Sequence, residues 1–292
     1  ISWGINPIMP RDYYYDRTQV KSAGPVKFLK KPTLSPLEKK LIAWGNRKTE
    51  RQGVKGILLE GQKLIEEALS VNYPLHTTWY SESFAERNAD IIARLSDTEA
   101  ELKSVSNRTM REISQLETSP GIVAAAPQPN FSIRRPDSPF SLIIALPKIQ
   151  DPANLGGIIR TADYFGVDEI WLGSESADPY KPKVIRGSMG AIFRLPIVRS
   201  STIREKLEQF KDAGAIILAA VPHGKNVVPA IPAVGSRILM IGEESKGLNA
   251  NMQNLAHRSL KIPGSGKGES LNIAVATGIL IYIATTGRLA SV

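Results

Sequence analysis

The chain has 292 residues, of which 42% are hydrophobic and 22% are charged, a composition typical of globular proteins and a length that suits two domains. It has no cysteine, which excludes disulfides, thiolate metal sites and cysteine nucleophiles, and its three scattered histidines lead us to expect no metal site. No apolar run approaches the roughly 20 residues of a membrane span, and no signal peptide is visible, so we expect a cytoplasmic protein without membrane contact.

Positive charge is concentrated at the start of the sequence. Residues 1–55 hold twelve Lys or Arg and four Asp or Glu, a net charge of +8 out of +9 for the whole chain. Prolines and little periodicity over residues 1–35 predict an extended basic arm. Its cations would neutralise the phosphates of a polyanion, and its aromatic side chains would accept unpaired bases. The alternative is a solvated leader that only keeps the protein in solution.

Residues 36–127 predict a small α/β domain. Ser35 and Pro36 have the residue types that begin a helix. Apolar runs and periodic apolar positions then indicate strand and helix in alternation. The expected elements are a strand at Ile57–Leu59, a helix carrying Leu64, Ile65, Ala68 and Leu69 on one face, a helix at Ser83–Ser96 and a strand at Gly121–Ala125.

Residues 128–139 are rich in proline and charge and predict a linker. A regular pattern follows over residues 140–292. Strands are expected at Leu142–Leu146, Glu169–Leu172, Ile216–Val221, Ile238–Ile241 and Leu260–Ile262, and helices at Gly156–Phe165, Ile203–Ala213 and Asn272–Thr285. Continuous apolar strands separated by helices predict a parallel sheet covered on both faces.

Three polar segments follow predicted strands, where open α/β sheets bind their ligands. The first runs from Asp151 to Ala162, the second from Ile241 to Leu248, and the third from Ile262 to Asn272. Each has a purely structural interpretation as well. Asn154, Ser270 or Asn272 could be plain helix caps, and the second segment could be a solvent-exposed turn.

Taken in this order, the three segments resemble the signature motifs of the SpoU/TrmH branch of the SPOUT RNA methyltransferases. The resemblance covers about Ser141 to Thr285. Two shorter stretches, Glu60–Ala68 and Ser119–Ala124, are similar to the small RNA-binding domain that often accompanies it. The resemblance implies an α/β SPOUT domain with a parallel sheet and a trefoil knot, which is an exception to the usual unthreaded topology. It also implies a homodimer.

The resemblance further implies methyl transfer from S-adenosylmethionine to a ribose 2′-hydroxyl of RNA. Carried over by position, the cofactor would lie against Gly242, Ile262 and Leu271. Arg160 matches the family's reactive arginine, as general base or as stabiliser of the alkoxide, which the sequence leaves open. The other matching site residues, which orient the arginine, the RNA or the cofactor loop, are Asn154, Glu244, Ser270 and Asn272.

Two positions depart from the family pattern. Glu243 stands where the second motif commonly has Asn, and Gly264 stands where the third often has a bulkier residue. The appended N-terminal domain favours ribosomal over transfer RNA as substrate. A tRNA-directed enzyme, a base methyltransferase and a non-catalytic RNA-binding scaffold are the alternatives.

Overall fold

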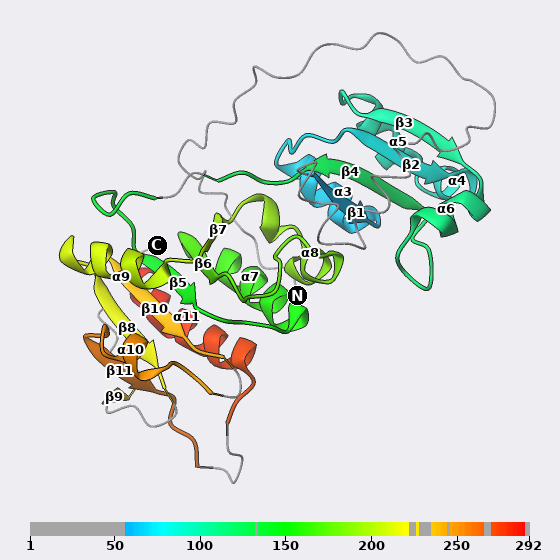
Figure 1. The fold of residues 1–292 in the computed structure, drawn as a ribbon. Helices are drawn as coiled ribbons and strands as arrows, with labels where there is room; N and C mark the ends of the chain where they lie inside the picture. Colours follow the sequence, from blue (N-terminus) through cyan, green and yellow to red (C-terminus); the bar gives the residue numbers. More distant parts are fainter. Residues whose placement is uncertain are drawn as a thin grey trace. The chain divides into compact units, whose positions relative to one another are not determined.

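The computed structural model describes residues 56–131, 134–221, 226–227, 235–243, 246–265 and 270–289. The predicted basic arm and the helix expected at Ser35 lie outside these residues. The described chain forms a four-stranded sheet in its first part and a seven-stranded sheet in its second (Figure 1).

The four-stranded sheet has the order β1-β4-β2-β3. Strand β4 pairs antiparallel with β1 and β2, and β2 pairs parallel with β3. Its elements are β1 (Gly56–Glu60), α3 (Gln62–Ser70), β2 (Thr77–Ser81), α4 (Glu82–Arg87), α5 (Ala89–Ser96), β3 (Glu101–Val105), α6 (Asn107–Ile113) and β4 (Ile122–Pro127). Successive residues of β1 face opposite sides: Leu59 packs in the core that includes α3, and Leu58 packs in the core that includes α6.

The prediction of one helix over Ser83–Ser96 was wrong, because two helices occupy this stretch. Asn88 separates them with φ −137° and ψ 49°, outside the helical region. Its side-chain amide donates a hydrogen bond to the Phe84 carbonyl oxygen at 2.9 Å, which closes α4. Asparagine competes for backbone groups in this way and therefore favours helix ends.

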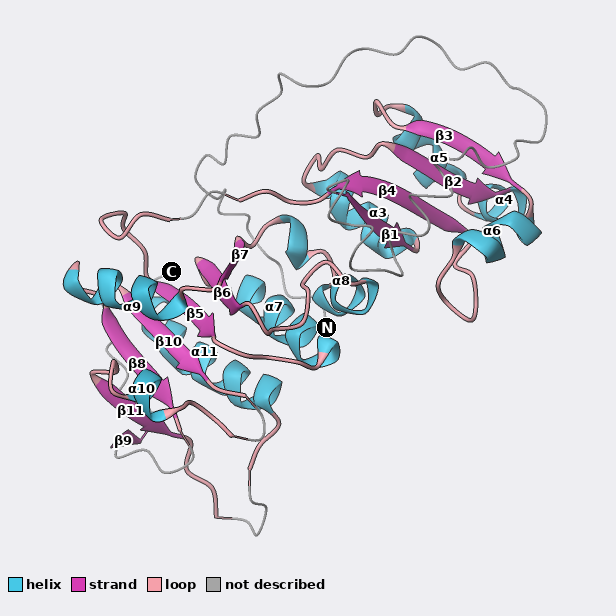
Figure 2. Cartoon of the chain, in the orientation of Figure 1, coloured by secondary structure: helices cyan, strands magenta, loops and turns pink. Residues whose placement is uncertain are grey.

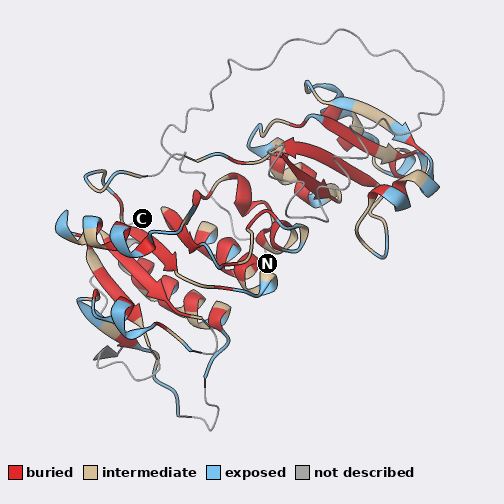
Figure 3. Cartoon of the chain, viewed as in Figure 1, coloured by how far each residue is buried: buried red, intermediate tan, exposed pale blue. Residues whose placement is uncertain are grey.

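The seven-stranded sheet is parallel throughout, as predicted, with the order β7-β6-β5-β10-β8-β11-β9. Strand β10 therefore lies between β5 and β8, although it follows both in the chain. The strands are β5 (Leu142–Leu146), β6 (Glu169–Gly173), β7 (Ile197–Ser200), β8 (Ile216–Ala220), β9 (Asn226–Val227), β10 (Arg237–Ile241) and β11 (Arg258–Lys261). Strands β5, β6 and β10 are buried along their whole length (Figure 3).

Helices cover both faces of this sheet, which confirms the prediction (Figure 2). They are α7 (Pro152–Tyr164), α8 (Pro182–Ser188), the 3₁₀ helix η2 (Ala191–Phe193), α9 (Ile203–Asp212), α10 (Ala250–Gln253) and α11 (Ile273–Leu289). Ile144 belongs to the core shared with α7 and α11, whereas its neighbour Ile143 belongs to the core shared with α9 and α10. The alternation of side chains along β5 thus distributes apolar surface to both helical layers.

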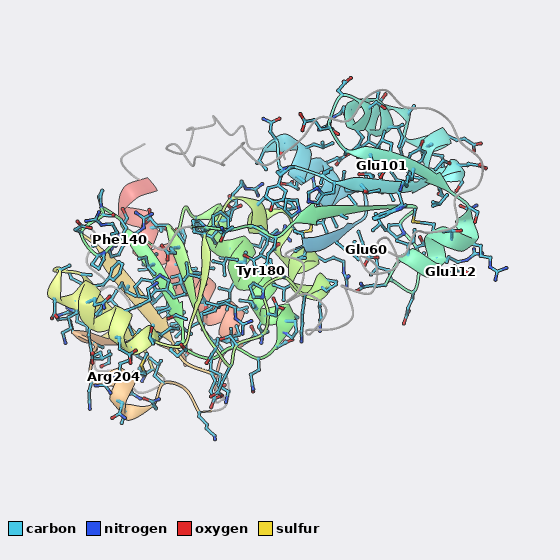
Figure 4. All side chains as sticks on the ribbon, turned by 45° about the horizontal axis from the view of Figure 1, so that its top comes forward. Glu60, Glu101, Glu112, Phe140, Tyr180 and Arg204 are labelled. Carbon is cyan, nitrogen blue, oxygen red and sulfur yellow. The ribbon has the colours of Figure 1, made fainter. Side chains whose placement is uncertain are left out.

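Two buried polar side chains tie distant segments to this sheet. Arg237, only 1% exposed, donates from Nη1 to the Ala284 carbonyl oxygen at 2.8 Å and thereby joins the start of β10 to the last turns of α11. The Tyr180 hydroxyl (Figure 4) donates to the Pro129 carbonyl oxygen at 3.1 Å, and burial raises the pKa of this phenol. The linker predicted from the sequence is therefore held at one point of the second sheet's layer.

Within the described residues, no helix is both long and apolar enough to cross a membrane.

Candidate active site

The polar segments singled out in the sequence lie at the carboxyl edge of the parallel sheet. Asp151 follows β5 and caps α7, because its Oδ1 accepts a hydrogen bond from the Ala153 amide at 2.9 Å. The helix therefore begins at Pro152, earlier than predicted, and Asn154 is not its cap. The Asn154 side chain therefore has a role other than capping this helix.

Asn154 meets Asn272 at this edge. The Asn272 Nδ2 donates to the Asn154 Oδ1 at 3.0 Å. The Asn272 Oδ1 accepts from the Ala274 amide at 2.8 Å and so also caps α11. The interpretation of Asn272 as a helix cap is thus confirmed, and the first and third segments are in contact. Ser270 and Leu271, immediately before this cap, are exposed.

A close helix–helix contact places the first turn of α7. A methyl group on Gly156 would lie 2.9 Å from the Gly187 Cα of α8 and 3.1 Å from the Val184 carbonyl oxygen. Real side chains almost never approach so closely, so only glycine fits. Gly156 therefore brings α8 against the start of α7, beside Asn154.

The Arg160 side chain lies on the exposed side of α7, and no hydrogen bond or ion pair joins it to another residue that the structure describes. It lines a pocket together with Lys63, Glu67, Tyr164 and Arg194. Arg194 forms ion pairs with both acidic residues of this pocket. Its guanidinium lies 3.0 Å from the Glu67 carboxylate and 2.8 Å from the Asp163 carboxylate. Among the described residues, Arg160 therefore has no counter-ion, and no hydrogen bond joins its side chain to Asn154 or Asn272.

The second segment forms a tight turn after β10. The Gly247 amide donates to the Glu243 carbonyl oxygen at 3.0 Å, and the two residues form an isolated antiparallel bridge. A methyl group on Gly242 would lie 2.0 Å from the Gly247 carbonyl carbon, which explains the glycine. Glu244 lies outside the described residues.

Lys148 is a site residue that sequence reasoning missed. It follows β5, and its Nζ lies 3.0 Å from the Glu243 Oε2 and 3.3 Å from the Glu175 Oε2. The hydrogen bond that Lys148 donates to Glu243, followed by the one it donates to Glu175, raises the pKa of Lys148. One lysine therefore joins the loops that follow β5, β6 and β10. The sequence feature that could have identified Lys148 is its position shortly after an apolar strand.

The three positions expected to hold the cofactor fit an adenosyl group. Gly242 exposes no side chain and lies where β10 ends. Ile262 follows β11 and packs against the core, whereas Leu271 is 50% exposed next to the cap of α11. Gly242 is buried and closes against Gly247, whereas the half-exposed Leu271 offers an apolar side chain to a ligand.

Comparison with known proteins agrees with this geometry. Residues 141–282 match the family model described as the SpoU rRNA Methylase family, and residues 39–124 match the model of an MRM3-like substrate binding domain. An uncharacterised tRNA/rRNA methyltransferase of Synechocystis is 32% identical over 250 residues, which are 86% of this chain and 90% of the relative. The chain belongs to the SpoU rRNA methylase family.

Two further similarities define the activity. The 23S rRNA (guanosine(2553)-2′-O)-methyltransferase RlmP of Bacillus subtilis is 28% identical, over 80% of this chain and 90% of the relative. The structure of an S-adenosylmethionine-bound rRNA methyltransferase from Sinorhizobium meliloti is 26% identical with a TM-score of 0.74, and covers 87% of this chain and 96% of that one. The protein is an RNA ribose methyltransferase with S-adenosylmethionine as its cofactor, which confirms the family prediction.

Proposed function

We propose that this methyltransferase modifies ribosomal RNA and that Arg160 stabilises the 2′-oxygen of the target ribose during transfer. One observation supports the role of Arg160 in particular: it lines a pocket in which both carboxylates form ion pairs with Arg194. A guanidinium without a counter-ion attracts an RNA phosphate or an oxygen that gains negative charge.

In the reaction, the 2′-oxygen would form a bond to the methyl carbon as the bond from that carbon to sulfur breaks, and the hydroxyl proton would pass to solvent water. The cofactor would supply the activated methyl group, because its sulfonium sulfur can keep the electron pair of the broken bond and leave as the neutral thioether S-adenosylhomocysteine. Arg160 keeps its proton, because the pKa of guanidinium exceeds about 12. We therefore assign it to alkoxide stabilisation and leave proton removal to another acceptor.

The remaining site residues have supporting roles in this proposal. Asn154 and Asn272 hold the starts of α7 and α11 together through their hydrogen bond. Ser270 and Glu244 orient RNA or the cofactor loop. The backbone around Gly242, Ile262 and Leu271 holds the adenosyl group. These assignments follow the family motif by position, and the fit of the Gly242 turn supports the last of them.

We further propose the domain division expected from the sequence: an arm over 1–35, an RNA substrate-binding domain over 36–127, a linker over 128–139 and a SPOUT domain over 140–292 with a trefoil knot. The match of residues 141–282 to the SpoU rRNA Methylase family supports the SPOUT domain. The match of residues 39–124 to a substrate binding domain supports the RNA-binding role.

The proposed homodimer would form through α7 and α11. These helices border a groove lined by Gly157, Ala274, Gly278 and Tyr282, among others. Tyr282 is 50% exposed on it. An apolar strip with small residues lets a second helix pair approach closely, and burial of exposed apolar side chains would stabilise the association.

Ribosomal RNA is favoured over transfer RNA because the relative RlmP acts on 23S rRNA, and this substrate is our reason for placing the enzyme in the cytoplasm. The test uses purified protein, methyl-labelled S-adenosylmethionine and either total ribosomal RNA or total tRNA. Digestion to nucleosides should show the label on ribose, in ribosomal RNA. Labelled base, labelled tRNA or no transfer would each support one of the alternatives named above.

The role of Arg160 is tested by Arg160→Ala. We expect methyl transfer to fall at least 100-fold while S-adenosylmethionine affinity stays within about twofold of wild type. Arg204→Ala is the matched control, because Arg204 is an exposed arginine on α9 whose ion-pair partner is Glu208. Equal activity of the two variants would remove Arg160 from the mechanism.

A further inference from the structure

The lysine that joins three loops at the cofactor edge has no role in the family motif described above. Lys148 comes from the loop after β5, and its two acidic partners come from the loops after β10 and β6. These three strands are neighbours in the sheet. The loops after β5 and β6 also touch directly, since a methyl group on Gly173 would lie 1.8 Å from the Pro147 carbonyl oxygen. Lys148 therefore lies in a loop that packs closely against the end of β6.

The two partners of Lys148 differ in burial, and this decides which pair matters. The Glu243 side chain is 12% exposed, whereas that of Glu175 is 72% exposed. An exposed ion pair contributes little because water and salt screen it. A carboxylate that is mostly withdrawn from water needs a partner. The Lys148–Glu243 pair is thus the significant contact, and Glu175 is a matched control.

The pair also accounts for the unusual residue in the second motif. An asparagine at position 243 would be neutral and would need no counter-charge. A carboxylate there, directly after Gly242, would add a negative charge to the turn if Lys148 did not offset it. The lysine and the glutamate together leave the turn neutral and add a fixed anchor between β5 and β10.

We propose that Lys148 is a positioning residue for S-adenosylmethionine, and that it acts by holding Glu243 and with it the turn formed by Gly242 and Gly247. The inference rests on the proposed placement of the cofactor at Gly242. Lys148 acts on the cofactor through the turn. Loss of Lys148 therefore weakens the binding of S-adenosylmethionine and of its uncharged-sulfur product, S-adenosylhomocysteine, by the same factor.

The test is calorimetry with both ligands on the full-length protein. Lys148→Met should weaken each ligand about tenfold, because it leaves Glu243 buried without a partner. Glu175→Gln should stay within twofold of wild type. The double variant Lys148→Met/Glu243→Asn should regain most of the affinity, because it removes the unpaired carboxylate and restores the amide common in the family. In steady state, the KM for the cofactor should rise while the KM for RNA stays constant.

Several outcomes would overturn the proposal. Lys148→Met could bind both ligands as wild type does, or the double variant could be as weak as the single one. A loss confined to one of the two ligands would indicate a charge effect on the sulfonium in place of positioning. If Lys148→Met does not fold, as judged by circular dichroism, the double variant tests the proposal instead. It must fold and bind both ligands, and failure to do so would refute the proposal. Wild-type protein that methylates RNA while Lys148→Met binds normally would refute this inference alone. Wild-type protein that binds no cofactor would refute the cofactor placement itself.

Discussion

Replacement of Gly156 by alanine is expected to disturb both stability and catalysis, whereas the same change at Gly157 is not. The two glycines are adjacent in α7, so both changes gain the same helix propensity, about 1 kcal/mol for alanine over glycine. Their surroundings differ. The new methyl group at position 156 would lie 2.9 Å from the Gly187 Cα, whereas the one at 157 would lie 3.8 Å from the Ala274 Cβ.

The magnitude follows from these distances. Carbon atoms in good contact are about 3.5–4.0 Å apart, so α7 and α8 must separate by roughly 0.5–1 Å to admit the methyl group at Gly156. Overpacking of this kind costs about 1–3 kcal/mol. Since the propensity gain is common to both variants, the free energy of unfolding of Gly156→Ala should lie about 1–3 kcal/mol below that of Gly157→Ala. The latter should match or exceed wild type.

Urea unfolding followed by circular dichroism, at one protein concentration for all three proteins, measures this difference. Because Gly157 lies on the proposed dimer face, the oligomeric state of each variant is checked by sedimentation. The displacement of α7 should also stretch the Asn154–Asn272 hydrogen bond of 3.0 Å. Misplacement of site groups by about 1 Å can cost up to 100-fold in rate, so we expect kcat of Gly156→Ala to fall about tenfold or more.

Equal unfolding free energies for the two variants would refute the reasoning, since they would show that the contact with Gly187 can relax without cost. A destabilised Gly156→Ala with normal kcat would refute only the link between this contact and the site.

Three further outcomes are expected. Arg237→Met should lower the free energy of unfolding by about 2–4 kcal/mol in urea titrations, because the Ala284 carbonyl oxygen loses a charged donor; a loss below about 1 kcal/mol would contradict this role. Burial, and then Lys211, lowers the pKa of His257, whose Nδ1 accepts from the Ile217 amide. The unfolded chain therefore binds more protons, so stability should fall as pH drops below about 6.5, and His257→Gln should flatten that dependence. Deletion of residues 1–35 should weaken RNA binding and reduce its salt slope; an unchanged slope would make the arm a leader only.

The core of the second sheet could be predicted because β5 and β8 are wholly apolar and β6 and β10 are mostly so. Strands β5, β6, β8, β10 and β11 were predicted within one or two residues of their observed bounds. Strands β2 and β3 were missed, and β3 shows why: only one of its five residues is buried, and Glu101–Val105 has no alternating apolar pattern. The conformation of an edge strand such as this one depends on its pairing with a neighbouring strand, and the local sequence does not indicate that pairing.

The site was predictable only where a motif covered it. The order of the three polar segments placed Asn154 and Asn272 at the same edge, and their hydrogen bond confirms that they meet. Lys148 was missed, because a single charged residue in a loop has no period or spacing. Its importance comes from Glu243, which is 95 positions away in the chain but close in space. The sequence marked Glu243 as unusual without indicating what offsets its charge.

The contact between Asn154 and Asn272 has a consequence for synthesis on the ribosome. The two amides are 118 residues apart in the chain, and β10 enters the sheet between strands made before it. Contacts of such long range form slowly and late. A nascent or truncated chain that stops before Asn272 carries Arg160 and the substrate-binding region, yet lacks one of the two amides that meet here. On the roles proposed above, such a chain would bind RNA without methylating it, so methylation would require a polypeptide that is complete through α11.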